Sequence, residues 1–138
     1  LNFIEPILPK MVLRQKGTIA LMSSLAGFHG MASAPGYSSS KAWVLSYGQG
    51  LRGKFFSKGI RVSVICPSFI KSRITQKNTF FMPLLMDTQK AATIIVNSLE
   101  KDKAQIAFPF LLYVLVVFLS FLPSQLTDKF ANYFPKKE

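Results

Sequence analysis

The order of apolar and polar residues predicts a strand–helix–strand unit in the first half of the chain. Apolar residues recur at helical spacing over residues 1–15, and an apolar run with little polar alternation follows at 17–24. Such a run is typical of a strand buried on both faces. A helical pattern extends from about residue 37 to residue 56, and a second β-rich run covers residues 60–67. This order predicts parallel strands in an α/β fold.

The pattern after residue 67 predicts one further helix and one further strand. Residues 68–87 show no regular period. Residues 88–101 form an amphipathic helical pattern that opens on Thr88, a residue type suited to capping a helix. The short apolar run at 105–108 predicts a third strand.

A long apolar run follows, because residues 106–122 contain no charge. Between Pro109 and Pro123 a helix over 110–122 would reach about 20 Å, short of the hydrocarbon core of about 30 Å. Three interpretations stay open: a helix buried at a subunit interface or over a substrate pocket, a membrane-surface anchor, and a full span. Lysines flank the run on both sides, and residues 124–134 predict a short amphipathic helix on the same surface.

Composition narrows the class of protein. A chain of 138 residues with 49% hydrophobic and 17% charged residues is long and apolar enough for one packed domain. The single cysteine, Cys66, excludes an intrachain disulfide and suits a reducing compartment. The net charge of +11 fits an anionic membrane or a phosphate-bearing ligand. No basic run interleaved with aromatic residues is present, so nucleic acid is not an expected partner.

Three glycines match a nucleotide-binding pattern but stand in the wrong context. Gly48, Gly50 and Gly53 form G-x-G-x-x-G, which cradles a pyrophosphate when it follows a strand and opens a helix. Here the pattern falls well inside the helix predicted from about residue 37, where backbone N–H groups are already bonded. We expect these glycines only to permit close packing.

Tyr37 and Lys41 are better candidates for chemistry. Four residues apart, they leave the same face of a helix. An ammonium close to a phenol favours the phenolate, which makes a tyrosine a better proton donor and acceptor near neutral pH. Ser24 ends the preceding strand thirteen residues earlier, where open α/β sheets meet ligands, and its hydroxyl could hold a substrate carbonyl oxygen. A single histidine, His29, does not predict a metal site.

These residues, in the stretches GTIALMSSLAG, YSSSK and GIRVSVICPSFIKS, resemble the C-terminal half of a short-chain dehydrogenase/reductase. The likeness runs from about Leu8 to Phe108. It implies the C-terminal half of a Rossmann-like, doubly wound parallel sheet, followed by an apolar helical tail. We therefore expect a partial catalytic domain over residues 1–108 and a tail over 109–138 that anchors to a membrane or an interface.

The resemblance also implies the roles of individual residues. Tyr37 would exchange a proton with the substrate oxygen, Lys41 would assist it and bond the nicotinamide ribose, and Ser24, or its neighbour Ser23, would polarise the carbonyl. The segment after the second strand would hold the nicotinamide of NAD or NADP through Pro67, Ile70 and Ser72. A serine at position 68 replaces the glycine usual in the family, which alters this loop.

The implied activity is hydride transfer between NAD or NADP and a small carbonyl or alcohol substrate, with a lipophilic compound favoured by the tail. Only 23 residues precede Ser24, so the glycine-rich dinucleotide turn that the family has further upstream is missing. We expect a longer natural protein; the alternatives are a partner chain that supplies the cofactor half and a non-catalytic remnant that binds a membrane or a partner. We expect a cytoplasmic protein that attaches to a membrane surface through residues 106–134, and a second copy of the chain is another candidate partner.

Overall fold

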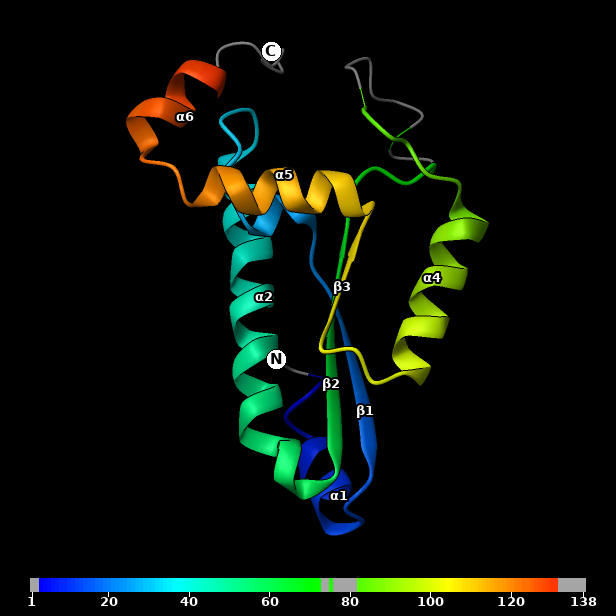
Figure 1. Ribbon diagram of the computed structural model, residues 1–138. Helices are drawn as coiled ribbons and strands as arrows, with labels where there is room; N and C mark the ends of the chain where they lie inside the picture. Colours follow the sequence, from blue (N-terminus) through cyan, green and yellow to red (C-terminus); the bar gives the residue numbers. More distant parts are fainter. Residues whose placement is uncertain (1–2, 73–74, 76–81, 132–138) are drawn as a thin grey trace.

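The computed structural model describes residues 3–72, 75 and 82–131 (Figure 1). Helices and strands alternate through most of this part of the chain. In chain order, with η marking short 3₁₀ turns, the elements are α1 (Leu8–Leu13), β1 (Gly17–Met22), η1 (Leu25–Gly27), α2 (Pro35–Phe55), η2 (Phe56–Lys58), β2 (Ile60–Pro67), α4 (Thr88–Glu100), β3 (Gln105–Phe108), α5 (Phe110–Ser120) and α6 (Ser124–Ala131).

The three described strands form a parallel sheet in the order β1-β2-β3, which confirms the predicted α/β class. The central strand, β2, is buried at seven of its eight residues. In β1, by contrast, Thr18, Ala20 and Met22 are exposed, although their neighbours are half-buried. The prediction that β1 is buried on both faces is wrong, because no described helix covers this face of the edge strand.

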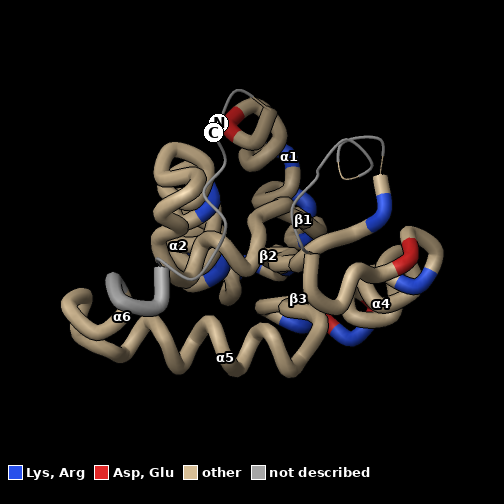
Figure 2. Tube along the Cα trace, turned by 90° about the horizontal axis from the view of Figure 1, so that it is seen from above, with Lys and Arg blue, Asp and Glu red and all other residues tan. Residues whose placement is uncertain are grey.

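Helices cover both faces of the sheet, as a doubly wound arrangement requires (Figure 2). On one face, Val62 and Val64 of β2 pack against apolar residues of α2. On the other face, Ile65 and Ile106 pack against Ala91 of α4 and its neighbours. The connection from β1 to β2 passes through α2, and the connection from β2 to β3 passes through α4. Both connections lead to the next strand in the same direction across the sheet, but α2 and α4 lie on opposite faces. The two connections therefore have opposite hands, and one departs from the usual right-handed rule.

The G-x-G-x-x-G pattern lies inside α2, so its helical placement was predicted correctly. The close-packing interpretation holds at Gly48 but is wrong at Gly50 and Gly53. A side chain at Gly48 would overlap Val64, whereas positions 50 and 53 have open space where a Cβ would be. Gly48 therefore allows α2 to lie directly on β2.

The capping residue of α4 differs from the prediction. Asp87, one residue earlier than Thr88, is the N-cap, and its carboxylate accepts a hydrogen bond from the Gln89 N–H at 3.2 Å. A carboxylate at this end also interacts favourably with the helix dipole. The Thr88 hydroxyl instead donates to the Lys71 carbonyl at 2.6 Å, which ties the start of α4 to the loop after β2.

Arg52 ties the far end of α2 to the sheet and to the turn before β3. Its guanidinium donates to the Val62 carbonyl at 2.8 Å and forms an ion pair with Asp102 at 2.9 Å. The hydrogen bond from Arg52 holds the pKa of the Asp102 carboxyl below its ordinary value. The turn after α4 is thereby fixed beside β2, which supports the register of β3.

The apolar run forms α5, which crosses the sheet at the carboxyl end of β3 (Figure 1). Leu112 and Tyr113 pack on the core, and the Tyr113 ring meets Phe28 edge-on at 5.4 Å. The opposite side of α5 is exposed and apolar, with residues Phe110, Leu111, Val114, Leu115 and Phe118. In the part of the chain that the structure describes, no helix combines the length and apolar content needed to cross a bilayer.

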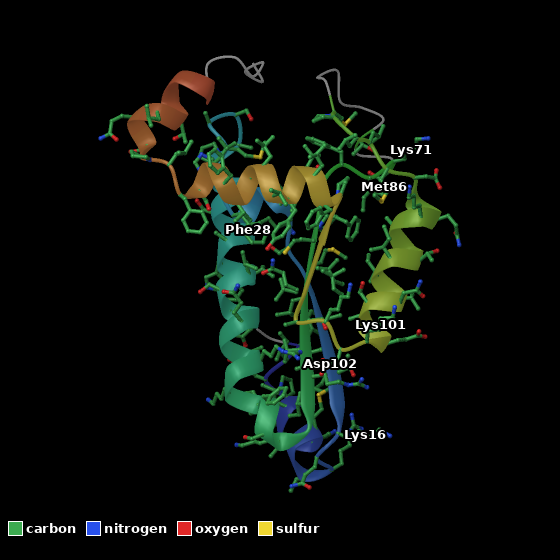
Figure 3. All side chains as sticks on the ribbon, in the orientation of Figure 1. Lys16, Phe28, Lys71, Met86, Lys101 and Asp102 are labelled. Atoms are coloured by element: carbon green, nitrogen blue, oxygen red, sulfur yellow. The ribbon has the colours of Figure 1, made fainter. Side chains whose placement is uncertain are left out.

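The tail beyond α5 is described only in part. The predicted amphipathic helix over 124–134 begins as expected with α6, which extends to Ala131, and residues 132–134 lie outside the described residues. Lys101 and Lys103 flank the apolar run in sequence, but they precede β3, whereas α5 follows it. Figure 3 shows Lys101 at the lower end of α4, away from α5. These two lysines therefore do not border the exposed face of α5.

Candidate active site

The predicted site residues lie where β1 and β2 end and α2 begins. Ser24 follows β1 as the N-cap of η1, and its buried hydroxyl accepts a hydrogen bond from the Ala26 N–H at 3.2 Å. The same hydroxyl donates to the carbonyl of Pro67 at 3.3 Å. Ser24 therefore connects the end of β1 with the end of β2, which places two predicted site residues together.

Tyr37 and Lys41 lie one turn apart at the start of α2, as predicted. The Lys41 ammonium is 5.7 Å from the centroid of the Tyr37 ring and donates to the Met22 carbonyl at 3.1 Å. The Tyr37 side chain is 50% exposed, and among the described residues its hydroxyl has no hydrogen-bond partner. The phenol is therefore accessible to a ligand, whereas the ammonium beside it is held to the end of β1.

Two features that were not predicted hold the start of α2 in place. The buried Ser38 hydroxyl accepts from the Met31 N–H at 3.2 Å and donates to the Pro35 carbonyl at 3.0 Å. A side chain at Gly27 would come within 2.9 Å of the backbone carbonyl of Lys41, so only glycine permits this approach of η1 to α2. The sequence signal for both is weak, because serine and glycine are common in loops.

The loop after β2 is anchored to the segment before α4. Ile70 forms a parallel bridge with Met86, and the Lys71 N–H donates to the Met86 carbonyl at 2.9 Å. Figure 3 shows Lys71 and Met86 side by side at the end of the molecule where Phe28 also lies. Within the described ranges the Ile70 N–H has no hydrogen-bond partner. It therefore remains available to a ligand.

Ser72 is turned toward its own loop. Its N–H donates to the Thr75 hydroxyl at 2.7 Å, and its hydroxyl accepts from the Thr75 N–H at 3.2 Å. Thr75 also donates to the Ile70 carbonyl at 2.9 Å, and so joins the two predicted cofactor residues. The structure thus brings Ile70 and Ser72 together, and Ser24 and Pro67 together. It gives no hydrogen bond between Ser24 and Tyr37.

Ser23, the alternative to Ser24 as the carbonyl-polarising residue, has its hydroxyl engaged by α2. It is 2% exposed, and its hydroxyl donates to the backbone carbonyl of Lys41 at 2.7 Å. Among the described residues, no group of histidine, cysteine, aspartate and glutamate side chains could hold a metal ion. His29 is half-buried in the loop after η1.

Cys66, next to Pro67, provides a test of burial at this end of the sheet. The side chain is fully buried, and this burial raises the pKa of the Cys66 thiol from 9.0 to about 11. The unfolded chain loses the thiol proton first, so the contribution of Cys66 to stability is complete below pH 9 and is lost as the pH rises through about 11.

We therefore expect the stability difference between the parent and Cys66→Ala to shrink by about 1 kcal/mol per pH unit over this interval. Urea unfolding of both proteins at a series of pH values measures it. A difference that stays constant with pH would contradict the buried, protonated thiol.

Comparisons with known proteins show the family and the fold of the chain. The family model for short chain dehydrogenases matches residues 1–82. An uncharacterized oxidoreductase of Myxococcus xanthus is 38% identical over 129 residues, covering 94% of this chain and 51% of the relative. Human epidermal retinol dehydrogenase 2 is 29% identical over 135 residues, covering 94% of this chain and 44% of the relative.

The fold is also shared with a solved structure, a short chain dehydrogenase from Burkholderia cenocepacia in complex with NADP. It has a TM-score of 0.77 and 19% identity, covering 93% of this chain and 54% of that one. The chain thus spans about half the length of the curated relatives it matches. The family-model match extends over more than half of the residues, from α1 to the loop before α4. The chain belongs to the short chain dehydrogenase family.

Proposed function

We propose that residues 1–108 form the C-terminal, substrate-side half of an oxidoreductase that transfers hydride between NAD or NADP and a carbonyl or alcohol carbon. The observation that carries this proposal is the placement of Lys41. Its ammonium is held by the Met22 carbonyl at the end of β1 and lies 5.7 Å from the ring of the accessible Tyr37. A phenol beside a fixed cation at the carboxyl end of parallel strands is suited to proton exchange with a bound substrate.

The loop after β2 fits a nicotinamide. The Ile70 N–H is available to donate a hydrogen bond to a carboxamide oxygen, and the Thr75 and Met86 contacts hold the backbone around it. Lys41 donates one hydrogen bond to Met22 and retains two N–H groups for ribose hydroxyls. The NADP complex of the Burkholderia relative supports a nicotinamide dinucleotide as the cofactor class, without choosing between NAD and NADP.

Tyr37, Lys41 and Ser24 would have separate roles in the reaction. Tyr37 donates a proton to the substrate oxygen during reduction and accepts it during oxidation, while the Lys41 ammonium stabilises the phenolate. Ser24 donates a hydrogen bond to the same oxygen after its hydroxyl proton turns away from Pro67. Rotation is inexpensive here, because a 3.3 Å hydrogen bond is long for a hydroxyl donor. The bound nicotinamide supplies the hydride.

The same proposal favours a lipophilic substrate. Phe28 and Tyr113 form an aromatic pair between η1 and α5, beside the loop that carries Ser24. The similarity to a protein named as a retinol dehydrogenase supports a substrate of this kind. A series of aldehydes with increasing alkyl length tests the idea, since kcat/KM should rise with chain length if apolar surface is buried on binding.

The activity is tested on the protein as its natural host produces it, with intact mass measured alongside oxidation of NADH and NADPH. We expect hydride transfer together with a mass well above 15.4 kDa, or together with a stoichiometric partner chain. A mass near 15.4 kDa, no partner and no transfer would overturn the proposal and favour the non-catalytic alternative.

We also propose that the exposed face of α5 lies on an anionic bilayer in the cytoplasm. Residues 104–127 carry no charge, and Figure 2 shows α5 free of charged residues, whereas the whole chain has a net charge of +11. An apolar surface on a strongly cationic chain matches the interface of an anionic membrane.

The lipid proposal predicts that Phe118→Ser weakens binding to vesicles of phosphatidylcholine and phosphatidylserine by about tenfold, because one largely exposed aromatic ring leaves the lipid. Phe56→Ser is the matched control, since Phe118 and Phe56 are similarly exposed (60% and 64%) and Phe56 lies in η2, at the far end of α2. Co-sedimentation measures binding. Absence of binding by the parent, or a dimer that Phe118→Ser dissociates, would assign this face to a second copy instead.

A further inference from the structure

Two adjacent serines follow β1, and their hydroxyls serve different partners. The Ser24 hydroxyl donates to the carbonyl of Pro67 at the end of β2. The Ser23 hydroxyl is buried and donates to the backbone carbonyl of Lys41 at 2.7 Å, while its N–H donates to the Ile65 carbonyl at 2.8 Å. Ser23 is therefore held in the sheet by its backbone and holds α2 by its side chain.

Two consecutive residues at the end of β1 hold Lys41: Ser23 holds its backbone carbonyl, and Met22 holds its side-chain ammonium. Its carbonyl accepts from Ser23, and its ammonium donates to the Met22 carbonyl at 3.1 Å. In an α-helix this carbonyl already accepts the N–H of residue 45, so the Ser23 hydroxyl is a second donor to it. The hydrogen bond is short, and no water competes for it because Ser23 is 2% exposed.

The neighbourhood of Ser23 leaves little room for α2 to shift. The backbone of Lys41 faces Gly27 so closely that no larger residue would fit there. The Ser23 N–H, in turn, donates to the Ile65 carbonyl of β2 at 2.8 Å. Ser23 thus contacts β2 through its N–H and α2 through its hydroxyl, next to the turn that carries Tyr37 and Lys41.

We propose that Ser23 is a positioning residue, whose hydroxyl sets the distance between the Lys41 ammonium and the Tyr37 phenol by holding the Lys41 carbonyl to the end of β1. This role rests on the proposed hydride transfer, and it differs from that of Ser24 because Ser23 does not touch the substrate. Loss of the hydroxyl leaves α2 packed on the sheet but lets its first turns move relative to Met22.

The test compares Ser23→Ala, Ser23→Thr and Ser63→Ala in the full-length protein. Ser63 is the matched control: it lies in β2, it is 1% exposed, and its hydroxyl has no partner among the described residues. We expect Ser23→Ala to lower kcat about tenfold with KM within about twofold of the parent, the loss of roughly one buried hydrogen bond. We also expect the pH–rate profile of Ser23→Ala to shift to higher pH, because the phenolate of Tyr37 would be less well stabilised.

Ser23→Thr, which retains the hydroxyl, should recover most of kcat, and Ser63→Ala should match the parent in kcat and in pH profile. Equal kcat and an unchanged pH profile in Ser23→Ala would overturn the proposal. An equal loss of kcat in Ser23→Ala and Ser63→Ala would also overturn it, because the loss would then follow from replacing any buried serine.

A second measurement does not depend on turnover. Acetylation rates of individual lysines, read by mass spectrometry, compare Lys41 with Lys54 of the same helix. We expect Ser23→Ala to raise the rate at Lys41 several-fold and to leave Lys54 unchanged, because only Lys41 is held at the end of β1. If the parent transfers no hydride but Lys41 is released in this way, the proposed function fails while the positioning contact stands. An unchanged Lys41 rate rejects the contact itself.

Discussion

Replacing Tyr37 with phenylalanine is expected to lower kcat by about 100- to 10,000-fold, the usual contribution of a general acid or base. Phenylalanine keeps the ring beside the Lys41 ammonium, 5.7 Å from its centroid, but it has no proton to exchange with the substrate oxygen. Cofactor affinity should stay within about threefold of the parent, because the ribose contacts assigned to Lys41 and the Ile70 loop remain.

The matched control is Tyr47→Phe, which removes a hydroxyl from the same helix. Tyr47 stacks on Trp43 with ring centroids 4.9 Å apart, and this contact does not need the hydroxyl. Steady-state kinetics with NADH and NADPH, together with cofactor titration by fluorescence, give kcat and the dissociation constant separately. Turnover of Tyr37→Phe within about tenfold of the parent would reject the acid–base role.

Gly48→Ala and Gly50→Ala are expected to change stability in opposite directions. A methyl group at position 48 would overlap Val64 and come within 3.0 Å of Leu21, so α2 has to move off the sheet. Overpacking of this kind costs about 1–3 kcal/mol. At position 50 the methyl meets open space, and alanine should gain up to about 1 kcal/mol from its higher helix propensity.

The free energies of unfolding of the two variants, measured in urea, should therefore differ by about 1–3 kcal/mol, the cost of the clash, because the gain in helix propensity is common to both. The double variant Gly48→Ala/Val64→Ala identifies the clash, because Val64→Ala makes room for the added methyl and the two changes should cost less together than separately. Equal stability of Gly48→Ala and Gly50→Ala would contradict the close contact between α2 and β2.

The chain's own pattern predicted most of the elements correctly. The β-rich run at residues 60–67 matched β2 at both ends, because a central parallel strand is buried on both faces and Pro67 cannot continue it. The glycine pattern was correctly rejected, since a phosphate loop needs free N–H groups that a helix interior lacks. The four-residue spacing of Tyr37 and Lys41 correctly predicted that they share one face of a helix, because this spacing is about one helical turn.

Errors arose where the outcome depended on distant segments. The residues of β1 are as apolar as those of a buried strand. They do not determine which helices cover its two faces, because those helices come from other parts of the chain. The cap of α4 moved from Thr88 to Asp87 because the Thr88 hydroxyl is engaged by the loop after β2. The lysines that flank the apolar run in sequence are separated from α5 by the whole of β3.

By itself, the sequence determined the α/β class, the order of the elements and the pairing of Tyr37 with Lys41, because these follow from residue spacing over one or two turns. Only the tertiary structure separated the two adjacent serines, sending Ser24 to the carbonyl of Pro67 and Ser23 to that of Lys41. Neighbours in a strand or at its end point to different sides, and the partner on each side comes from another part of the chain. Which hydroxyl joins the ends of β1 and β2 and which one holds α2 is therefore decided by packing.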